Sequence, residues 1–308
     1  MKAHLAIARF DHSIKNVFVL PGIVIPLSVS SVINTRLIAR NVVLGLLAVT
    51  LIACSNYVLN ELLDAPFDRL HPSKRHRPVA QGTVLPIIGF AQWLLMMLAG
   101  LLVAALISKS FLYVNATLWL MGCVYNIPPL RTKDLPYLDV LSESLNNPLR
   151  LLLGWYMVTS TLIPPLSLLI AYWMIGAYFM ALKRLSEYRQ IADAATASAY
   201  RRSFAYYSSQ SLLVSVVFYA SASMLFFGAF LMRYRVELIC SFPFLAVTMA
   251  IYFHLAFQHE SAVQNPEKLY RERGLMISVA TYVGVSLVLL WVDIPFLSTF
   301  FTSTLRRH

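Results

Sequence analysis

The chain has 308 residues, of which 58% are hydrophobic and 13% are charged, and its mean hydropathy is +0.67. This composition excludes a soluble globular domain and predicts a single all-α, polytopic membrane domain. We expect no nucleic-acid partner despite the net charge of +11, because in a membrane protein the positions of the charges matter more than their sum. Cys54, Cys123 and Cys240 lie in apolar segments, which predicts buried small side chains rather than disulfides or metal thiolates.

Apolar runs of about 17 residues or more predict nine membrane helices. They lie near residues 16–34, 41–63, 85–107, 110–126, 138–159, 164–182, 204–232, 238–257 and 274–292. With the N-terminus in the cytoplasm, 17 of the 25 Lys and Arg residues face the inner side, which favours that orientation and places residues 306–308 outside. Twelve of the 14 acidic residues also lie at the inner side. We therefore expect an active site that faces the cytoplasm from the cytoplasmic membrane.

The first fifteen residues contain no short apolar core followed by a cleavage site, so we expect no signal peptide.

The segments that this topology places at the inner side are polar. The loops near residues 65–84, 127–137, 183–203 and 258–273 are rich in charge, and we expect them to cap a site at the membrane surface. Four histidines at the inner side lack the spacing of metal ligands, and none is expected to bind metal: His71, His76, His254 and His259.

The second predicted helix ends in a row of polar side chains that recur every four residues: Asn56, Asn60, Asp64 and Asp68. Four residues advance a helix by about 400°, so these groups share one face with a drift of roughly 40° per step. A basic loop between two prolines follows at once and contains Lys74, Arg75 and Arg77. Oxygen ligands beside cations suit a Mg²⁺–diphosphate substrate. A solvated helix rim is the alternative, but ionisable groups at membrane depth are costly and usually functional.

The same stretch resembles the first aspartate-rich motif of the UbiA superfamily of intramembrane prenyltransferases, Asn-Asp-x-x-Asp-x-x-x-Asp. Here the motif is Asn60-Glu61-x-x-Asp64-x-x-x-Asp68, with Glu in place of the second Asp. The continuation is most similar to the branch of decaprenyl-phosphate phosphoribosyltransferases, and it runs Asp68-Arg69-x-His71-Pro72-x-Lys74-Arg75-x-Arg77-Pro78. The resemblance implies nine helices around a central cavity and Mg²⁺ bound by the four motif residues. It also implies phosphoribosyl diphosphate and a polyprenyl phosphate as substrates.

A second polar constellation begins at Tyr125 and continues through a loop that contains Pro128-Pro129-Leu130-Arg131 and Lys133. In the next helix one face carries Asp139, Glu143, Asn146 or Asn147, and Arg150. Such a stripe either binds a ligand or forms an internal polar network that only ties helices together.

In the superfamily this position carries the second acidic motif, Asp-x-x-x-Asp, which corresponds here to Asp139-x-x-x-Glu143. The resemblance implies that these carboxylates hold a second Mg²⁺ or the ribose hydroxyls. The stretch 143–148 and the Pro-Pro-Leu-Arg loop depart from the phosphoribosyltransferase branch, and that loop is more typical of prenyltransferases with aromatic acceptors.

Basic residues at two other inner positions have two interpretations. Lys15 precedes the first predicted helix, and Lys183 and Arg184 follow the sixth. Each can simply extend to the lipid headgroups or form an interfacial rim. The resemblance to the phosphoribosyltransferase branch implies instead that they contact phosphate groups of the substrates.

The residues and the resemblance together predict a Mg²⁺-dependent transferase that moves 5-phosphoribose to a polyprenyl phosphate, giving a cell-wall lipid precursor. The expected catalytic residues are Asp64, Asp68, Asp139 and Glu143. The expected substrate-binding residues are Lys15, Asn56, Asn60, Lys74, Arg75, Arg77, Tyr125, Arg131, Asn147, Arg150, Lys183 and Arg184. One alternative is transfer of a polyprenyl chain from its diphosphate to an aromatic acceptor. A transporter or lipid-binding protein is the other, and the sequence shows no inverted repeat that would favour it.

Overall fold

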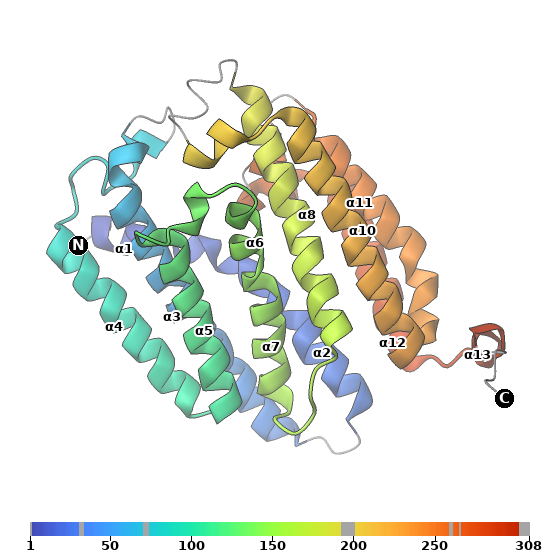
Figure 1. Ribbon diagram of the computed structural model, residues 1–308. Coiled ribbons are helices and arrows are strands. Elements are labelled where there is room, and N and C mark those ends of the chain that lie inside the picture. The colour runs from blue at the N-terminus through green and yellow to red at the C-terminus, as the bar shows by residue number, and fades with distance from the viewer. Residues whose placement is uncertain are drawn as a thin grey trace. The chain divides into compact units, whose positions relative to one another are not determined.

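The computed structural model describes residues 2–30, 34–69, 74–191, 201–258, 261–264 and 266–301. Over this part of the chain every regular element is helical and no strand occurs (Figure 1). Seven helical stretches are long and apolar enough to cross a membrane: Lys2–Val29, Thr35–Asp68, Pro86–Ala105, Leu166–Gln190, Ser209–Tyr234, Val236–Ala256 and Arg273–Trp291. The prediction of an all-α, multi-pass membrane protein is confirmed. The expectations for His71, Pro72, His259 and residues 306–308 fall outside the described residues.

The chain groups into two compact units, Met1–Pro164 with Ile191–Ser211, and Pro165–Gln190 with Leu212–His308. In the labels, η marks a 3-10 helix. The first unit contains α1 (Lys2–Ile7), η1 (Phe10–Val19), α2 (Leu20–Val29), α3 (Thr35–Asp68), η2 (Lys74–His76), α4 (Pro86–Ala105), α5 (Lys109–Asn126), η3 (Thr132–Asp134), α6 (Leu138–Ser144), α7 (Asn146–Val158) and η4 (Arg202–Tyr206). The second contains α8 (Leu166–Gln190), α10 (Ser209–Tyr234), η5 (Val236–Ser241), α11 (Phe242–Ala256), η6 (Ala262–Gln264), η7 (Pro266–Arg271), α12 (Arg273–Trp291) and α13 (Pro295–Phe301). That the units form one transferase domain stays a prediction.

Two of the nine predicted membrane segments do not appear among the seven long helices. The segment at 110–126 is helical and forms α5, which has 18 residues. The segment at 138–159 divides at Leu145 into α6 and α7, which have 7 and 13 residues. These are the segments that polar residues interrupt most, so the count of nine spans is not confirmed by length and composition.

The first unit is built around α3, which packs against α4, α5 and α7 (Figure 1). The helices α2 and α7 approach so closely that their backbones touch. A Cβ on Gly22 would lie 2.0 Å from the carbonyl oxygen of Leu151, and one on Gly154 would lie 2.2 Å from that of Val19. Small residues allow this contact, which is a common way for membrane helices to associate.

The ends of α3 and α5 follow from their sequences. Asn34 caps α3 by accepting a hydrogen bond from the Leu37 backbone N–H at 3.1 Å, and Ser108 caps α5 by accepting one from Phe111 at 3.1 Å. The helix α5 ends at Asn126 because Ile127 precedes a proline and adopts an extended conformation. The loop that begins at Ile127 carries charged residues, and it lies at the polar C-terminal ends of α3 and α5.

In the second unit, side chains tie the helices together through backbone carbonyl groups. The Tyr178 hydroxyl on α8 donates a 2.8 Å hydrogen bond to the carbonyl of Met249 on α11. Arg235 donates to the carbonyls of Leu289 and Val292 at 3.1 and 3.0 Å, which satisfies the C-terminal end of α12. The first contact joins α8 to α11 within their lengths, and the second holds the C-terminal end of α12 in place.

Candidate active site

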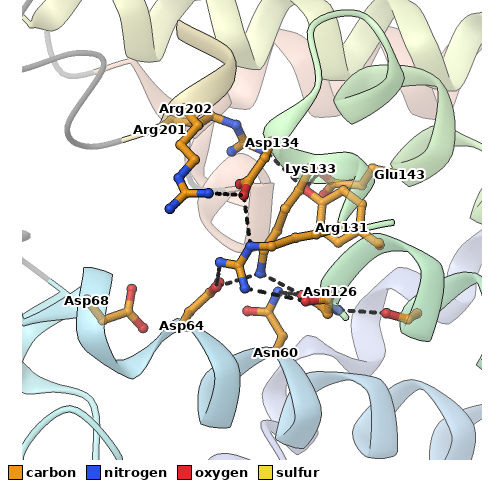
Figure 2. Close-up of polar contacts among 12 residues, drawn as sticks. Asn60, Asp64, Asp68, Asn126, Arg131, Lys133, Asp134, Glu143, Arg201 and Arg202 are labelled. Carbon is orange, nitrogen blue, oxygen red and sulfur yellow. Dashed lines mark hydrogen bonds and ion pairs between the residues drawn. The ribbon is translucent and has the colours of Figure 1, made fainter. Parts of the chain in front are cut away.

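Figure 2 shows Asn60, Asp64 and Asp68 projecting from α3 toward the same side, as their four-residue spacing predicted. Asn56 lies one turn earlier, where its Nδ2 donates a 3.0 Å hydrogen bond to the carbonyl of Leu118 on α5. The Oδ1 atom of Asn56 is buried and has no hydrogen-bond partner among the described residues. A buried acceptor of this kind is unfavourable unless a ligand or water satisfies it.

The carboxylate of Asp64 is held by two cations from the loop after α5. Its Oδ1 accepts from Nη2 of Arg131 at 2.9 Å and from Nζ of Lys133 at 2.5 Å. Arg131 has a left-handed backbone conformation with φ 23°, and this turn directs the loop back over α3. Burial lowers the pKa of Lys133 to about 8, while the Asp64 carboxylate opposes that shift.

Asn126, the last residue of α5, joins the loop to the polar row. Its Oδ1 accepts from Nδ2 of Asn60 at 2.7 Å and from Nζ of Lys133 at 2.7 Å. Its Nδ2 donates to the carbonyl of Gly122 at 2.8 Å. Lys133 therefore bridges the amide of Asn126 and the carboxylate of Asp64 (Figure 2).

The loop after α3 folds back on the other end of the row. Arg77 forms a 2.7 Å ion pair with Oδ2 of Asp68, and both side chains are largely buried. The Oε1 atom of Glu61 accepts a 3.3 Å hydrogen bond from the backbone N–H of Val79, so this carboxylate anchors the loop. Lys74 and Arg75 lie in η2, at the start of the same loop.

The second acidic motif anchors a segment that is distant in the sequence. Asp139 is 0% exposed. Its two oxygens accept from the hydroxyls of Tyr207 at 2.7 Å and Ser203 at 3.2 Å, and it pairs with Arg201 at 3.4 Å. Glu143 accepts a 2.9 Å hydrogen bond from the Tyr125 hydroxyl. Arg201 also donates to the Tyr125 hydroxyl at 3.0 Å, so the two carboxylates belong to one polar network. That they bind a ligand stays a prediction.

Two arginines surround one aromatic ring at the edge of the site. Arg131 and Arg202 lie over the ring of Phe67, with the guanidinium carbons 5.0 and 5.8 Å from its centroid. Both also pair with Asp134, at 3.0 Å from Nε of Arg131 and 3.7 Å from Nη1 of Arg202. Figure 2 shows Arg201 and Arg202 entering above the Asp64 cluster from η4 and the residue before it.

Sequence reasoning missed four residues of this cluster as members of a site: Asn126, Asp134, Arg201 and Arg202. Asn126 and Asp134 lie close in the chain to predicted residues, so their neighbours offered a signal. The Arg201 pair with Asp139 has no such signal, because it depends on a segment that returns from far along the chain.

The remaining predicted residues of the first unit lie on η1 and α7. The ammonium group of Lys15 is 5.6 Å from the ring centroid of Tyr57, which Arg9 also approaches at 5.9 Å. Arg150 is buried on α7, and its Nη1 donates to the carbonyl of Asn146 at 3.5 Å. Asn147 lies in the first turn of the same helix.

Lys183 and Arg184 belong to α8 in the second unit. Arg184 is buried and forms a 3.0 Å ion pair with Glu187, one helical turn later. Their expected contact with substrate phosphate stays a prediction.

The polar row fits a hard cation that is shared with a substrate. Among the described residues, no three His, Cys, Asp or Glu side chains gather closely enough to form a metal site by themselves. In this part of the chain, the ion pairs of Asp64 fall on its Oδ1 atom and the ion pair of Asp68 falls on its Oδ2 atom. The other carboxylate oxygen of each residue can therefore bind a cation. At phosphate sites, Mg²⁺ takes one or two carboxylates and completes its coordination with water and phosphate oxygens.

Comparison with known proteins gives a family match over most of the chain. The model of the UbiA prenyltransferase family matches residues 17–279. The uncharacterized protein y4nM of Sinorhizobium fredii is 28% identical over 154 residues, which are 50% of this chain and 28% of that protein. The decaprenyl-phosphate phosphoribosyltransferase of Mycolicibacterium smegmatis is 29% identical over 195 residues, 62% of this chain and 58% of the relative. The chain thus spans less than two thirds of both relatives.

The fold is similar to that of solved structures. A UbiA homolog from Archaeoglobus fulgidus, solved bound to GPP and Mg²⁺, superimposes with a TM-score of 0.71. The alignment covers 94% of this chain and 100% of that one, at 19% sequence identity. At this identity the likeness concerns the fold alone.

Proposed function

Because the chain belongs to the UbiA prenyltransferase family, we propose that it transfers 5-phosphoribose from phosphoribosyl diphosphate to a polyprenyl phosphate, releasing diphosphate. The similarity to a decaprenyl-phosphate phosphoribosyltransferase supports this choice of donor and acceptor. The site would face the cytoplasm, where the water-soluble donor is available, while the lipid acceptor would arrive from the bilayer. The distribution of basic residues along the chain supports this orientation.

The observation that carries the proposal is the number of cations that three separate segments bring to the C-terminal end of α3: Arg77, Arg131, Lys133, Arg201 and Arg202. Phosphoribosyl diphosphate carries phosphate groups at both ends of its ribose, and each end is best bound by cations. A prenyl diphosphate carries phosphate at one end only, and its tail requires an apolar tunnel. Cations that come from three segments therefore favour the donor with two anionic ends.

In the proposed reaction the bond between C1 of the ribose and the diphosphate oxygen breaks, and diphosphate leaves with the electron pair. An oxygen of the lipid phosphate forms the new bond to C1. That oxygen is already anionic, so no side chain has to remove a proton from the acceptor. Arg131 and Lys133 would leave Asp64 and bind phosphate oxygens, which stabilises the charge that develops on the departing group. Exclusion of water would protect the cationic carbon from hydrolysis.

Asn60, Asp64 and Asp68 would hold Mg²⁺ against the diphosphate. When bound, Mg²⁺ would neutralise the negative charge of the leaving group. Glu61 remains a predicted ligand, although its Oε1 is engaged by the backbone of Val79. Asp139 and Glu143 would act on the substrate through Arg201 and Tyr125, the residues they hold in place.

Transfer of a polyprenyl chain to an aromatic acceptor is the second candidate. The observation that favours it is the structural similarity to a homolog solved with GPP and Mg²⁺, together with the Pro128-Pro129-Leu130-Arg131 loop. In that reaction the same Mg²⁺ ligands would hold the diphosphate of the lipid instead of the diphosphate of a sugar.

A labelling experiment separates the two candidates. Membranes that contain the protein are incubated with radiolabelled phosphoribosyl diphosphate and decaprenyl phosphate, and label is measured in the organic phase. We expect label to enter the lipid with the wild-type protein and not with Asp64→Asn. A matched incubation supplies labelled polyprenyl diphosphate and an aromatic acid. Product in the second incubation alone would refute phosphoribosyl transfer and support the prenyltransferase.

A further inference from the structure

We propose that Asn126 is a positioning residue, which fixes the amide of Asn60 so that the Asn60 oxygen faces the cation that Asp64 helps to bind. This inference rests on the proposed metal–diphosphate function, and it concerns a residue that the aspartate-rich motif does not contain. Asn126 is on α5, whereas Asn60 and Asp64 are on α3. Asn126 is therefore proposed to orient the metal ligand Asn60 and not to contact the substrate.

The chemistry of Lys133 fixes the orientation of Asn126. An ammonium group can only donate hydrogen bonds, so the Asn126 atom that lies 2.7 Å from Nζ of Lys133 must be the oxygen. The carbonyl of Gly122 can only accept, so the Asn126 atom 2.8 Å away from it must be the nitrogen. Two independent partners, one on each side of the amide, thus require the same orientation.

The orientation of Asn60 follows from that of Asn126. The Asn60 atom that lies 2.7 Å from Oδ1 of Asn126 faces an acceptor, so it must be the donor Nδ2. The Oδ1 atom of Asn60 is then directed away from Asn126, and Figure 2 shows it on the side of Asp64. An amide that turned by 180° would place its NH₂ group there instead, and an NH₂ group cannot bind a cation.

The surroundings of Asn126 stabilise this orientation of the Asn60 amide. The residue is 3% exposed, so water does not compete for its amide. The same Oδ1 atom receives hydrogen bonds from both Asn60 and Lys133, and Lys133 also holds Asp64 at 2.5 Å. Lys133 therefore holds this oxygen in place for Asn60. Residues that orient metal ligands typically change metal affinity by about 10- to 100-fold when removed.

The test measures Mn²⁺ binding by electron paramagnetic resonance in the presence of inorganic diphosphate, so it needs neither an acceptor lipid nor turnover. We expect Asn126→Leu, which removes both acceptor and donor, to weaken Mn²⁺ binding by about 10- to 100-fold. If Asn126→Leu does not fold, Asn126→Ser, whose hydroxyl is too short to reach Asn60, should show the same loss.

Asn115→Leu is the matched control. Asn115 is also a buried asparagine of α5, and its Nδ2 donates to the carbonyl of Gly100 at 3.4 Å, remote from the polar row in the sequence. We expect this variant to bind Mn²⁺ like the wild-type protein. A second control uses the pair: in an Asn60→Ala background, Asn126→Leu should cause no further loss, because it acts through Asn60.

The outcomes are distinguishable. Equal Mn²⁺ affinity of Asn126→Leu and the wild-type protein would overturn the positioning role and leave the proposed function standing. An independent further loss in the Asn60→Ala background would also overturn it. No Mn²⁺ binding by the wild-type protein in the presence of diphosphate would overturn the proposed metal site together with the inference. In turnover assays, the positioning role requires Asn126→Leu to raise the Mg²⁺ concentration for half-maximal rate while the KM of the acceptor lipid stays unchanged.

Discussion

Gly122 allows α5 to approach α3 beside the polar row, and the substitution Gly122→Ala tests that approach. A Cβ at this position would lie 2.2 Å from Cγ, 2.3 Å from Oδ1 and 2.4 Å from Nδ2 of Asn56. No carbon atom can remain so close to these atoms, so the Asn56 side chain must turn away or the two helices must separate. Turning away breaks the 3.0 Å hydrogen bond from Asn56 to the Leu118 carbonyl.

The expected loss of stability follows from three terms. Overpacking of a close contact costs about 1–3 kcal/mol, and the broken hydrogen bond costs about 1 kcal/mol more. Alanine recovers about 1 kcal/mol through its higher helix propensity. We therefore expect Gly122→Ala to lower the free energy of unfolding by about 1–3 kcal/mol. Turnover should fall by about 100-fold, because a displacement of about 1 Å at a reacting site can have that effect.

The assays are thermal unfolding in detergent and phosphoribosyl transfer in membranes. Gly284→Ala on α12 is the control, because a Cβ there would have no atom within 4 Å, and it should leave both readouts unchanged. In an Asn56→Ala background the clash is gone, so Gly122→Ala should no longer destabilise the protein. Wild-type stability and turnover in Gly122→Ala alone would refute the close approach of α5 to α3.

Four further predictions follow from the site and its surroundings. Asp64→Asn and Asp68→Asn should each reduce turnover at least about 100-fold, and EDTA should stop the reaction reversibly; near-full activity at saturating Mg²⁺ would contradict the metal assignment. Arg77→Gln should raise the KM for phosphoribosyl diphosphate about tenfold or more, since a charged hydrogen bond to phosphate contributes about 1.5–3 kcal/mol; an increase in the acceptor KM alone would count against this role. Asp139→Ala should lower the free energy of unfolding by about 3 kcal/mol, because it leaves Arg201 without its buried partner; an unchanged melting temperature would show that the pair is not stabilising. Reporter fusions should place the N-terminus in the cytoplasm, and an external signal would reverse the topology.

The polar row could be predicted from the sequence because its geometry is local. A helix repeats every 3.6 residues, so the spacing of Asn60, Asp64 and Asp68 alone places them on one face. The membrane character was equally accessible, since the length and hydropathy of the helices determine it. The break at Leu145 was not predicted, although polar residues and a proline flank it: Glu143 and Ser144 precede it, and Asn146, Asn147 and Pro148 follow it. Their spacing also fits one helical face, and that interpretation was chosen.

The partners of the carboxylates could not be predicted, because they depend on contacts between residues far apart in the chain. Asp64 binds Arg131 from 67 positions away, and Asp139 binds Tyr207 from 68 positions away. A helical pattern shows which side chains share a face but does not show which loop returns to meet them. Only the fold reveals that the second acidic motif holds the segment that carries Arg201.

The double ion pair of Asp64 has a consequence for the way ligands enter the site. A cation that arrives alone must share the Asp64 carboxylate with Arg131 and Lys133, which repel it, and an anion that arrives alone must draw these two cations away and leave Asp64 uncovered. Either ligand by itself therefore gains little. When both arrive together, every charge keeps a partner. We therefore expect positive heterotropic coupling, in which a divalent cation and diphosphate raise each other's affinity by the same factor.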